Sequence, residues 1–163
     1  MNDLLYAPWR MAYILGDKPQ GCIFCEYPAR GVSPETLVLH VAEHAFVVLN
    51  RYPYINGHVM VIPRAHVSHV ADLEPAAHAA TAQLLQATAG ILRTVLRPDG
   101  MNLGMNVGHA AGAGIDSHVH YHIVPRWVGD SNFVDVVGGT RVLNEGLDAT
   151  FAKLAPHFAH LPT

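Results

Sequence analysis

The sequence predicts an α+β domain in which one long helix covers an antiparallel sheet of about five strands. Short runs of apolar and β-branched residues, at 37–41, 45–49 and 58–62, are separated by turn residues and are typical of an antiparallel meander. Residues 75–96 carry apolar side chains at helical spacing. The chain has 163 residues, half of them hydrophobic, which suits one domain with a substantial core.

The boundaries of each element follow from turn and helix-end signals. Only three residues separate the first two runs, which therefore form a hairpin, and an Asn-Gly turn at 56–57 leads to the third. Pro75 suits the first turn of the long helix, and the Pro-Asp-Gly sequence at 98–100 ends it. The remaining patterned stretches predict a strand at 101–107, a strand at 118–127 and a terminal helix at 145–158.

We expect a single domain over residues 1–163. It divides into an N-terminal arm (1–35), a core (36–130) and a C-terminal segment (131–163). Residues 4–14 of the arm are rich in aromatic side chains, so we expect this stretch to pack on the body of the protein or on a second subunit.

The charge balance argues against a nucleic acid polymer as partner. The formal net charge is -3, the sequence pI is about 6.4 and the chain has 10 Lys and Arg residues, whereas a duplex-binding surface needs concentrated positive charge. No apolar stretch approaches the length that spans a bilayer, and the N-terminus lacks the pattern of a signal peptide. We therefore expect a cytoplasmic protein that acts on a small molecule and not at a membrane.

Histidine is the strongest compositional bias, with 12 in the chain, and three of them alternate along the stretch 118–127. Successive side chains of a strand point to opposite faces, so His118, His120 and His122 share one face while the apolar residues that alternate with them pack on the core. An edge strand with exposed histidines is the alternative. The strict period of 2, directly after a glycine-rich loop, argues against it.

A row of imidazoles after such a loop suits phosphoryl chemistry. Neutral imidazole can attack phosphorus and form a covalent phosphoramidate. A second imidazole, together with backbone N–H groups of the small residues at 108–114, would hold the charge that develops on the phosphoryl oxygens. The pattern therefore indicates transfer of a phosphorus-containing group.

The only two cysteines, Cys22 and Cys25, form a CxxC pair. Without an export signal a structural disulfide is disfavoured, which leaves half of a zinc site or a redox pair. A redox pair is expected to open a helix, and Pro28, Gly31 and Pro34 argue against a helix here. A zinc site needs two further ligands from elsewhere in the chain.

The stretch HVHYHIVPRW at 118–127 resembles the signature of the histidine triad (HIT) family of nucleotide hydrolases and transferases. The resemblance continues in YAPWR and CIFC near the N-terminus, in LNRYPYINGHVMVIPRAH at 49–66 and in AGAGI before the triad. Together these motifs resemble the branch that acts on diadenosine polyphosphates, whose hydrolase and phosphorylase members are alike at these motifs. Val119 argues against the related hexose-1-phosphate uridylyltransferases, which have proline there. The resemblance implies a HIT-like fold and a homodimer.

The resemblance also implies roles for individual side chains. His120 would be the nucleophile that takes up a nucleoside monophosphate, and His122 would contact the phosphate. His118 and His58 would complete the catalytic group, His118 by holding the strand and His58 by lying beside the active site. The residues expected to bind substrate are Asn50 at the ribose, Asn106 near the phosphate, and Gly112, Ala113, Gly114, Ile115 and Ser117 in the loop before the triad.

In zinc-containing members of the family, two CxxC cysteines, a histidine after the third strand and the first triad histidine share one metal. The matching residues here are Cys22, Cys25, His66 and His118, a Cys2His2 set that suits a structural Zn2+ site. His69, three residues after His66, is a rival ligand. We also count Mg2+ that accompanies the substrate among the candidate cofactors.

The segment before the triad departs from the family pattern. Well-known members have Gly-Gln-Ser or Gly-Gln-Thr there, and the glutamine and hydroxyl contact the phosphate; this chain has AGIDS at 113–117. Either the backbone takes over the binding or Ser117 replaces the missing hydroxyl. Asp116 places a negative group near an anionic substrate.

Three functions therefore compete. The first is a hydrolase or nucleotidyl transferase that cleaves dinucleoside polyphosphates, such as diadenosine tetraphosphate, or else nucleoside phosphoramidates or adenylylated substrates. The second is a metal-dependent enzyme with all three triad histidines as ligands, which is disfavoured because side chains on one face of a strand are about 7 Å apart per step. The third is a nucleotide-binding regulator without turnover.

Overall fold

The computed structural model describes residues 21–130, 133–138 and 142–163. The predicted aromatic stretch at 4–14 lies outside the described residues. A five-stranded antiparallel sheet has the strand order β1-β2-β3-β5-β4. The strands are β1 (Val38–Val41), β2 (Ala45–Leu49), β3 (Val59–Pro63), β4 (Gly100–Gly104) and β5 (Tyr121–Arg126). The helices are α2 (Ile23–Arg30), α3 (Pro75–Leu96), α4 (Phe133–Gly138) and α5 (Leu147–Phe158), with short 3-10 turns η1 (Val70–Asp72) and η2 (His109–Ala111).

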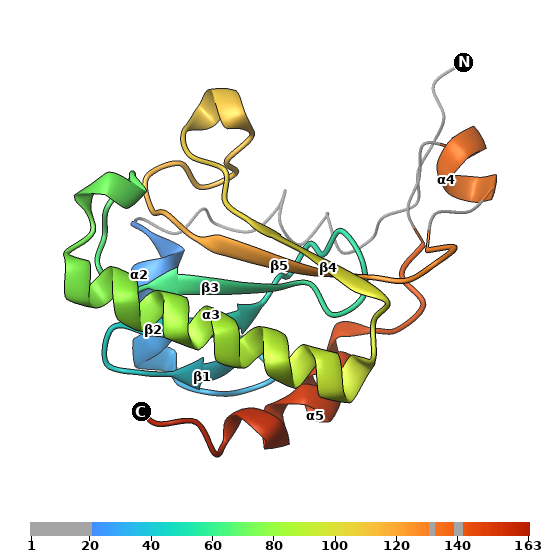
Figure 1. Ribbon diagram of the computed structural model, residues 1–163, viewed down its shortest axis with the longest axis horizontal. Helices are drawn as coiled ribbons and strands as arrows, with labels where there is room; N and C mark the ends of the chain where they lie inside the picture. The colour runs from blue at the N-terminus through green and yellow to red at the C-terminus, as the bar shows by residue number, and fades with distance from the viewer. Residues whose placement is uncertain (1–20, 131–132, 139–141) are drawn as a thin grey trace.

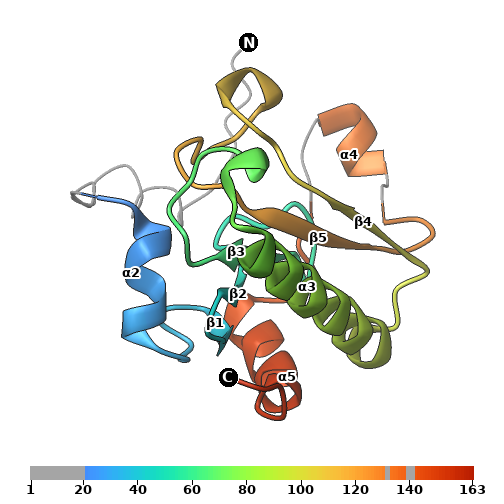
Figure 2. The same ribbon diagram turned by 60° about the vertical axis from the view of Figure 1, so that its left-hand side comes forward.

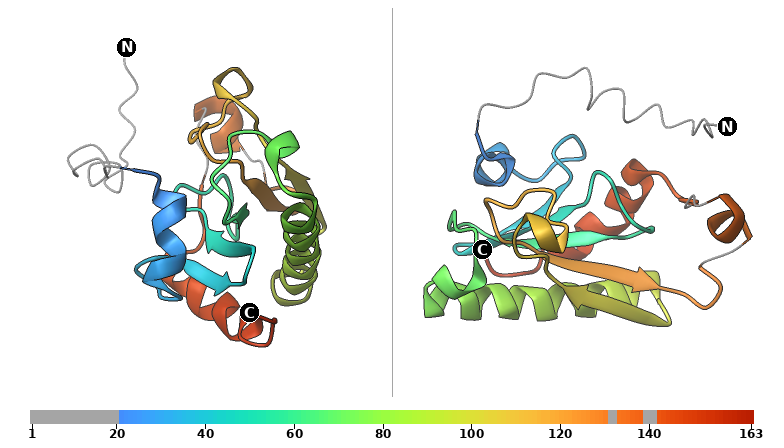
Figure 3. Two further views of the ribbon diagram at one scale, coloured as in Figure 1. Left: turned by 90° about the vertical axis from the view of Figure 1, so that its left-hand side faces the viewer. Right: turned by 90° about the horizontal axis from the view of Figure 1, so that it is seen from above.

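Helices cover both faces of the sheet. α3 runs along one face and packs on β2, β3 and β5 (Figure 1). α2 lies on the opposite side, where it contacts β1 (Figure 2). α5 contacts both β1 and α3, and the view along the sheet in the left panel of Figure 3 shows α2 and α3 on either side of it. The predicted α+β class and five-stranded antiparallel sheet are confirmed.

The long helix has the predicted bounds. Pro75 occupies its first turn, and Arg97 follows its end in the left-handed conformation, with φ 49°. Its buried face meets the core at helical spacing, as predicted, through Ala77, Thr81, Leu84, Thr88 and Leu92. The core also contains the fully buried side chains Phe46, Ile62, Ile123, Leu154 and Phe158.

The stretch that leads into and forms β5, between β3 and β4, alternates as the sequence predicts. Val119 and Ile123 are buried, and the half-buried Tyr121 reaches α3, where its hydroxyl lies 3.1 Å from Nε2 of His78. The opposite face therefore carries the triad imidazoles. His78 is exposed, as predicted, but its ring helps to tie α3 to the sheet.

Strand β5 is shorter than predicted and begins at Tyr121, so His118 and His120 precede it. The reason lies at the end of β3. Pro63 has no N–H to offer the ladder, and the backbone N–H of Val119 instead donates to the carbonyl of Val67 at 2.8 Å. The predicted strand at 101–107 also shortens to β4, because its last pair, Gly104 with His122, lies near the start of β5.

The expectation that no helix follows the cysteines is wrong. Cys22 caps the start of α2, and Pro28 lies inside this short helix. Pro28 lies in the last turn of the helix, where it removes only one backbone donor. The helix ends three residues later, at Gly31, which has φ 74°. The C-terminal helix begins at Leu147, two residues after its predicted start, and α4 lies in a stretch for which no helix was predicted.

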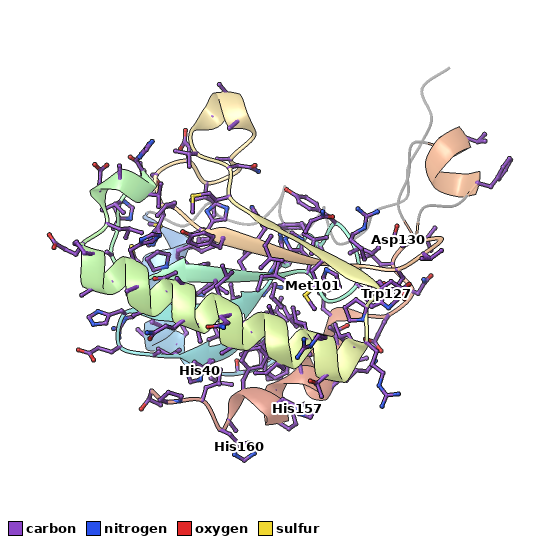
Figure 4. All side chains as sticks on the ribbon, in the orientation of Figure 1. His40, Met101, Trp127, Asp130, His157 and His160 are labelled. Carbon is purple, nitrogen blue, oxygen red and sulfur yellow. The ribbon has the colours of Figure 1, made fainter. Side chains whose placement is uncertain are left out.

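A carboxylate fixes the far end of β5. Asp130 accepts hydrogen bonds from Nε and Nη2 of Arg126, at 2.6 and 2.8 Å, and from the backbone N–H of Trp127 at 3.1 Å. Trp127 and Asp130 lie together at the turn after the strand (Figure 4). The arginine and tryptophan of the triad stretch therefore anchor the strand. Among the described helices none has the length and apolarity to cross a membrane.

Candidate nucleotidyl-transfer site

The tautomer of His120 is set by the backbone carbonyl of His118, two residues earlier. Its Nδ1 lies 2.8 Å from the carbonyl oxygen of His118, which can only accept, so Nδ1 carries the proton and donates. In the neutral ring Nε2 therefore keeps its lone pair. The side chain is buried, at 4% exposure, so the ring has a fixed orientation and an unprotonated nitrogen.

His122 has the opposite tautomer, imposed by a chain of hydrogen bonds. The backbone N–H of Tyr54 donates to Nδ1 of His58 at 3.1 Å, and the Nδ2 of Asn50 lies 3.3 Å from the same atom. The proton of neutral His58 is therefore on Nε2, which lies 3.0 Å from Nδ1 of His122 and donates to it. Neutral His122 thus carries its proton on Nε2.

The site contains an acceptor and a donor side by side. The rings of His120 and His122 have centroids 4.9 Å apart and planes at 76°. One ring offers a lone pair on Nε2 and the other offers a hydrogen-bond donor on Nε2. A nucleophile next to a donor for phosphoryl oxygens is the pairing that attack on phosphorus needs.

Burial keeps these imidazoles neutral. It lowers the pKa of His120 below the usual imidazole value. Burial, and secondly the neighbouring His120, lowers the pKa of His122 to about 4. Burial also lowers the pKa of His118, against the opposing effect of its hydrogen bond to the Pro63 carbonyl. At neutral pH the lone pair on Nε2 of His120 is therefore available and not blocked by a proton.

His118 points away from the other two triad rings toward the cysteines. Its Nε2 lies 2.8 Å from the Pro63 carbonyl and donates to it, which leaves the lone pair of Nδ1 facing Sγ of Cys22 at 3.3 Å and of Cys25 at 3.7 Å. Nδ1 of His66 lies 3.2 Å from Sγ of Cys25. A triad that ligates one metal with all three rings is therefore not what the structure shows.

The four predicted ligand atoms fit a tetrahedral metal. They all lie within 4.8 Å of one another. Tetrahedral zinc with bonds of about 2.0–2.3 Å would separate its ligand atoms by roughly 3.3–3.8 Å. The hydrogen bond from Nε2 of His118 to Pro63 orients the ring for ligation. The rival His69 is engaged elsewhere, since its Nδ1 accepts the N–H of Ala71 at 3.1 Å and caps η1.

The glycine-rich loop forms a 3-10 turn that projects beyond the sheet (Figure 1). Gly112 ends the turn with φ 88°, a conformation that suits glycine. Ala113 is buried and Ile115 packs against the core, whereas Gly114, Asp116 and Ser117 are exposed. The structure gives no hydrogen bond between Asn106 or Ser117 and a triad ring within the part of the chain it describes, so their contacts to substrate stay predictions.

Two aromatic side chains in the site were missed by the sequence analysis. The ring of Phe24 packs on His118 and His120, with centroids 5.6 and 5.1 Å away. The ring of Tyr54 lies 4.6 Å from that of His58 and 6.0 Å from that of His122. Both lie inside motifs of the resemblance, and only the fold shows that they frame the imidazoles.

Comparison with known proteins agrees with this geometry. Residues 30–128 match the model of the HIT domain family. The AP-4-A phosphorylase of Mycobacterium tuberculosis is 35% identical over 167 residues, covering 97% of this chain and 85% of its own. The asymmetrical bis(5'-nucleosyl)-tetraphosphatase of Schizosaccharomyces pombe is 30% identical over 128 residues, covering 78% of this chain and 67% of its own.

A solved structure that contains bound zinc shares the fold of this chain. A zinc-bound histidine triad family protein from Mycobacterium smegmatis superposes with a TM-score of 0.68 and 28% identity, over 85% of this chain and 94% of its own. The triad, its supporting histidine and the family match over more than half of the chain lead to one conclusion. This protein belongs to the histidine triad family.

Proposed function

We propose that the protein cleaves dinucleoside polyphosphates, such as diadenosine tetraphosphate, by transferring a nucleotidyl group to His120. The single observation that carries the proposal is the opposed pair of tautomers. The carbonyl of His118 leaves Nε2 of His120 unprotonated, while His58 leaves the proton of His122 on Nε2. The named activities of the M. tuberculosis and S. pombe relatives support the same class of substrate.

The first step forms one bond and breaks another. Nε2 of His120 attacks the α-phosphorus, the N–P bond forms, and the bond from this phosphorus to the bridging oxygen breaks. The Nε2–H of His122 donates to the phosphoryl oxygens, where negative charge increases. For diadenosine tetraphosphate the leaving group is ATP, and adenylyl-His120 remains.

The second step returns the nucleotide to an acceptor. Water gives AMP and inorganic phosphate gives ADP, in both cases with cleavage of the N–P bond and release of Nε2. Asn50 and the loop of Gly112, Ala113, Gly114, Ile115 and Ser117 would hold the ribose and phosphate during both steps. The hydrogen bond of Asn50 to His58 supports its place beside the reacting group.

Cys22, Cys25, His66 and His118 would hold a structural zinc ion. Such an ion would supply a cross-link between distant segments and would not touch the substrate. Any Mg2+ would arrive with the polyphosphate, whose negative charge it offsets.

The test is product analysis. Purified protein is incubated with diadenosine tetraphosphate, with and without inorganic phosphate, and the nucleotides are separated by chromatography. ADP plus ATP that appears only with phosphate identifies a phosphorylase, and AMP plus ATP without phosphate identifies a hydrolase. Mass spectrometry of the acid-free quenched protein should show one added adenylyl group. Binding of nucleotide without any turnover would contradict the proposal and favour a regulator.

We propose a homodimer as the assembled state. β4 is the last strand of the sheet, four of its five residues are exposed, and Leu103 is 49% exposed. An uncovered strand edge suits pairing with a second copy. Light scattering on the eluted peak should give twice the 17.7 kDa chain mass, and a single chain mass would contradict the proposal.

A further inference from the structure

A phenylalanine connects the four-ligand cluster to the nucleophile. Phe24 stands between the two cysteines in sequence, and its side chain is only 2% exposed. Its ring meets His118, a ligand, with planes at 90°, and meets His120, the nucleophile, with planes at 60°. One side chain therefore contacts both the metal site and the reacting group.

The ring of His120 contacts two other rings. Its centroid lies 5.1 Å from that of Phe24 and 4.9 Å from that of His122. The hydrogen bond from Nδ1 to the carbonyl of His118 fixes the remaining rotation. Of these three restraints only Phe24 comes from a different part of the chain, so its position depends on where α2 lies.

The place of α2 depends in turn on the cysteines. This helix has eight residues, and Cys22 and Cys25 form its first turn, with a backbone hydrogen bond of 3.0 Å between them. The helix has a second attachment at Tyr27, whose ring packs on Phe46 of β2. Bonds from both thiolates to a shared metal would fix the turn that carries Phe24 against His66 and His118, two ligands rooted in the body of the protein.

We propose that Phe24 is a positioning residue for His120, and that the Cys22, Cys25, His66 and His118 cluster sets its place. The inference rests on the proposed function for its kinetic readout. The metal then acts on turnover from outside the site, by holding the ring that keeps Nε2 of His120 aimed at phosphorus. Small misplacements of a reacting atom cost large factors in rate, so the effect is expected in kcat.

The first test is Phe24→Leu, which keeps apolar bulk but loses the flat ring. We expect one equivalent of zinc by elemental analysis, a KM for diadenosine tetraphosphate within twofold of wild type, and a kcat lower by about tenfold or more. The matched control is Arg30→Leu, at the exposed end of the same helix, where the side chain pairs with Glu26; this variant should keep the wild-type kcat. A kcat for Phe24→Leu equal to that of the control would overturn the proposal.

The second test removes zinc by chelation from wild type and from Phe24→Leu. If the metal acts through Phe24, the loss of zinc and the substitution of Phe24 remove the same restraint on His120. Zinc loss should then lower kcat by a larger factor in wild type than in Phe24→Leu, where that restraint is already missing. Equal factors in the two proteins would show that metal and ring act independently. That result would contradict the proposal.

A third readout needs no turnover. The 15N chemical shifts of the His120 imidazole separate its two tautomers, and we expect the wild-type zinc protein to hold the proton on Nδ1 alone. Phe24→Leu and zinc-free wild type should both show a mixture, while Arg30→Leu should not. An unchanged tautomer in Phe24→Leu and in zinc-free wild type would overturn the positioning role of Phe24. If wild type instead shows a single tautomer that Phe24→Leu loses, but no protein turns over substrate, only the proposed function has failed.

Discussion

The orientation and tautomer of the His120 ring come from a hydrogen bond to the backbone carbonyl of His118, two residues earlier. Because the His118 carbonyl lies 2.8 Å from Nδ1, the lone pair of the neutral ring is on Nε2 whatever the substrate. His118 thus orients the ring of His120 with its backbone carbonyl and faces the cysteines with its side chain. Alternate spacing alone predicts a row of rings. It does not predict that the first ring turns away.

Removing the imidazole of His120 should abolish turnover and leave the fold intact. For His120→Ala we expect kcat to fall at least about a thousandfold, because the unprotonated Nδ1 atoms of His122 and His118 are engaged by His58 and by the cysteines. His157→Ala removes an exposed histidine of α5 and is the matched control. Circular dichroism should be unchanged in both variants. Activity near wild type in His120→Ala would remove it from the mechanism.

His122 makes stability depend on pH. Its pKa is about 4 in the folded protein and about 6.5 in the unfolded chain, so between these values only the unfolded chain takes up the proton. Stability should therefore be constant above about pH 7 and fall toward pH 4. Urea unfolding at pH 7.5 and 5 should show a loss larger by about 1 kcal/mol in wild type than in His122→Asn, after allowance for partial exposure. Equal losses would contradict the assigned shift.

At the scale of elements, the loop between β2 and β3 carries the backbone N–H of Tyr54 and the side-chain amide of Asn50, which set the tautomer of His58. Near the end of this loop, Gly57 has φ 74° and lies against α3. A Cβ added there would overlap Cδ1 of Leu96 and lie 3.4 Å from Cγ of Pro125. The turn can therefore close on the helix only with glycine at this position.

Gly57→Ala should destabilise the protein by about 2 kcal/mol, from backbone strain and the contact with Leu96. Gly90→Ala is the control, since Gly90 lies within α3 and an added Cβ meets nothing within 4 Å. That change should stabilise by about 0.5 kcal/mol, because alanine favours the helix. Both values come from denaturant unfolding. A neutral Gly57→Ala would mean that the loop adjusts without cost.

The elements differ in how much of them the sequence reveals. α3 is predictable to the residue because a proline opens it and its buried face repeats over 22 residues. α2 is not, because eight residues with an internal proline are too few for a periodic pattern to outweigh the proline. The end of β4 depends on where its partner strand begins, which is information from a distant part of the chain.

The residues of the site also differ in how far the sequence predicts them. Residue type and spacing reveal the triad and the cysteine pair, since few other patterns place three histidines at period 2. Phe24 and Tyr54 carry no such signal, because a single aromatic residue in a short motif is as typical of a core. Their contacts with the imidazoles arise only when α2 and the loop after β2 fold over the sheet.

For the whole molecule, the cluster joins three segments that are far apart in sequence. Cys22 and Cys25 belong to α2, His66 follows β3, and His118 precedes β5. The closed loops between them are long, so a metal bound by all three would restrict the unfolded chain strongly.

Cys22→Ser should lower zinc content and thermal stability together. We expect less than one equivalent of zinc and a melting temperature lower by about 10 °C, the shift for a loss of a few kcal/mol in a domain of this size. His69→Ala, which removes a histidine near the cluster but outside it, should keep the metal. Full zinc content in Cys22→Ser would show that the cysteines are not ligands.

The strand order also fixes when the site can exist during synthesis. β5 pairs with β3 on one side and with β4 on the other, although β4 precedes it in the chain. A nascent chain that has emerged only to Gly104 holds the hairpin strands and the long helix, but β4 has no neighbour and the triad is still inside the ribosome. The strand that completes the sheet follows directly after His118 and His120, so the arrangement of the triad rings can form only when the sheet closes.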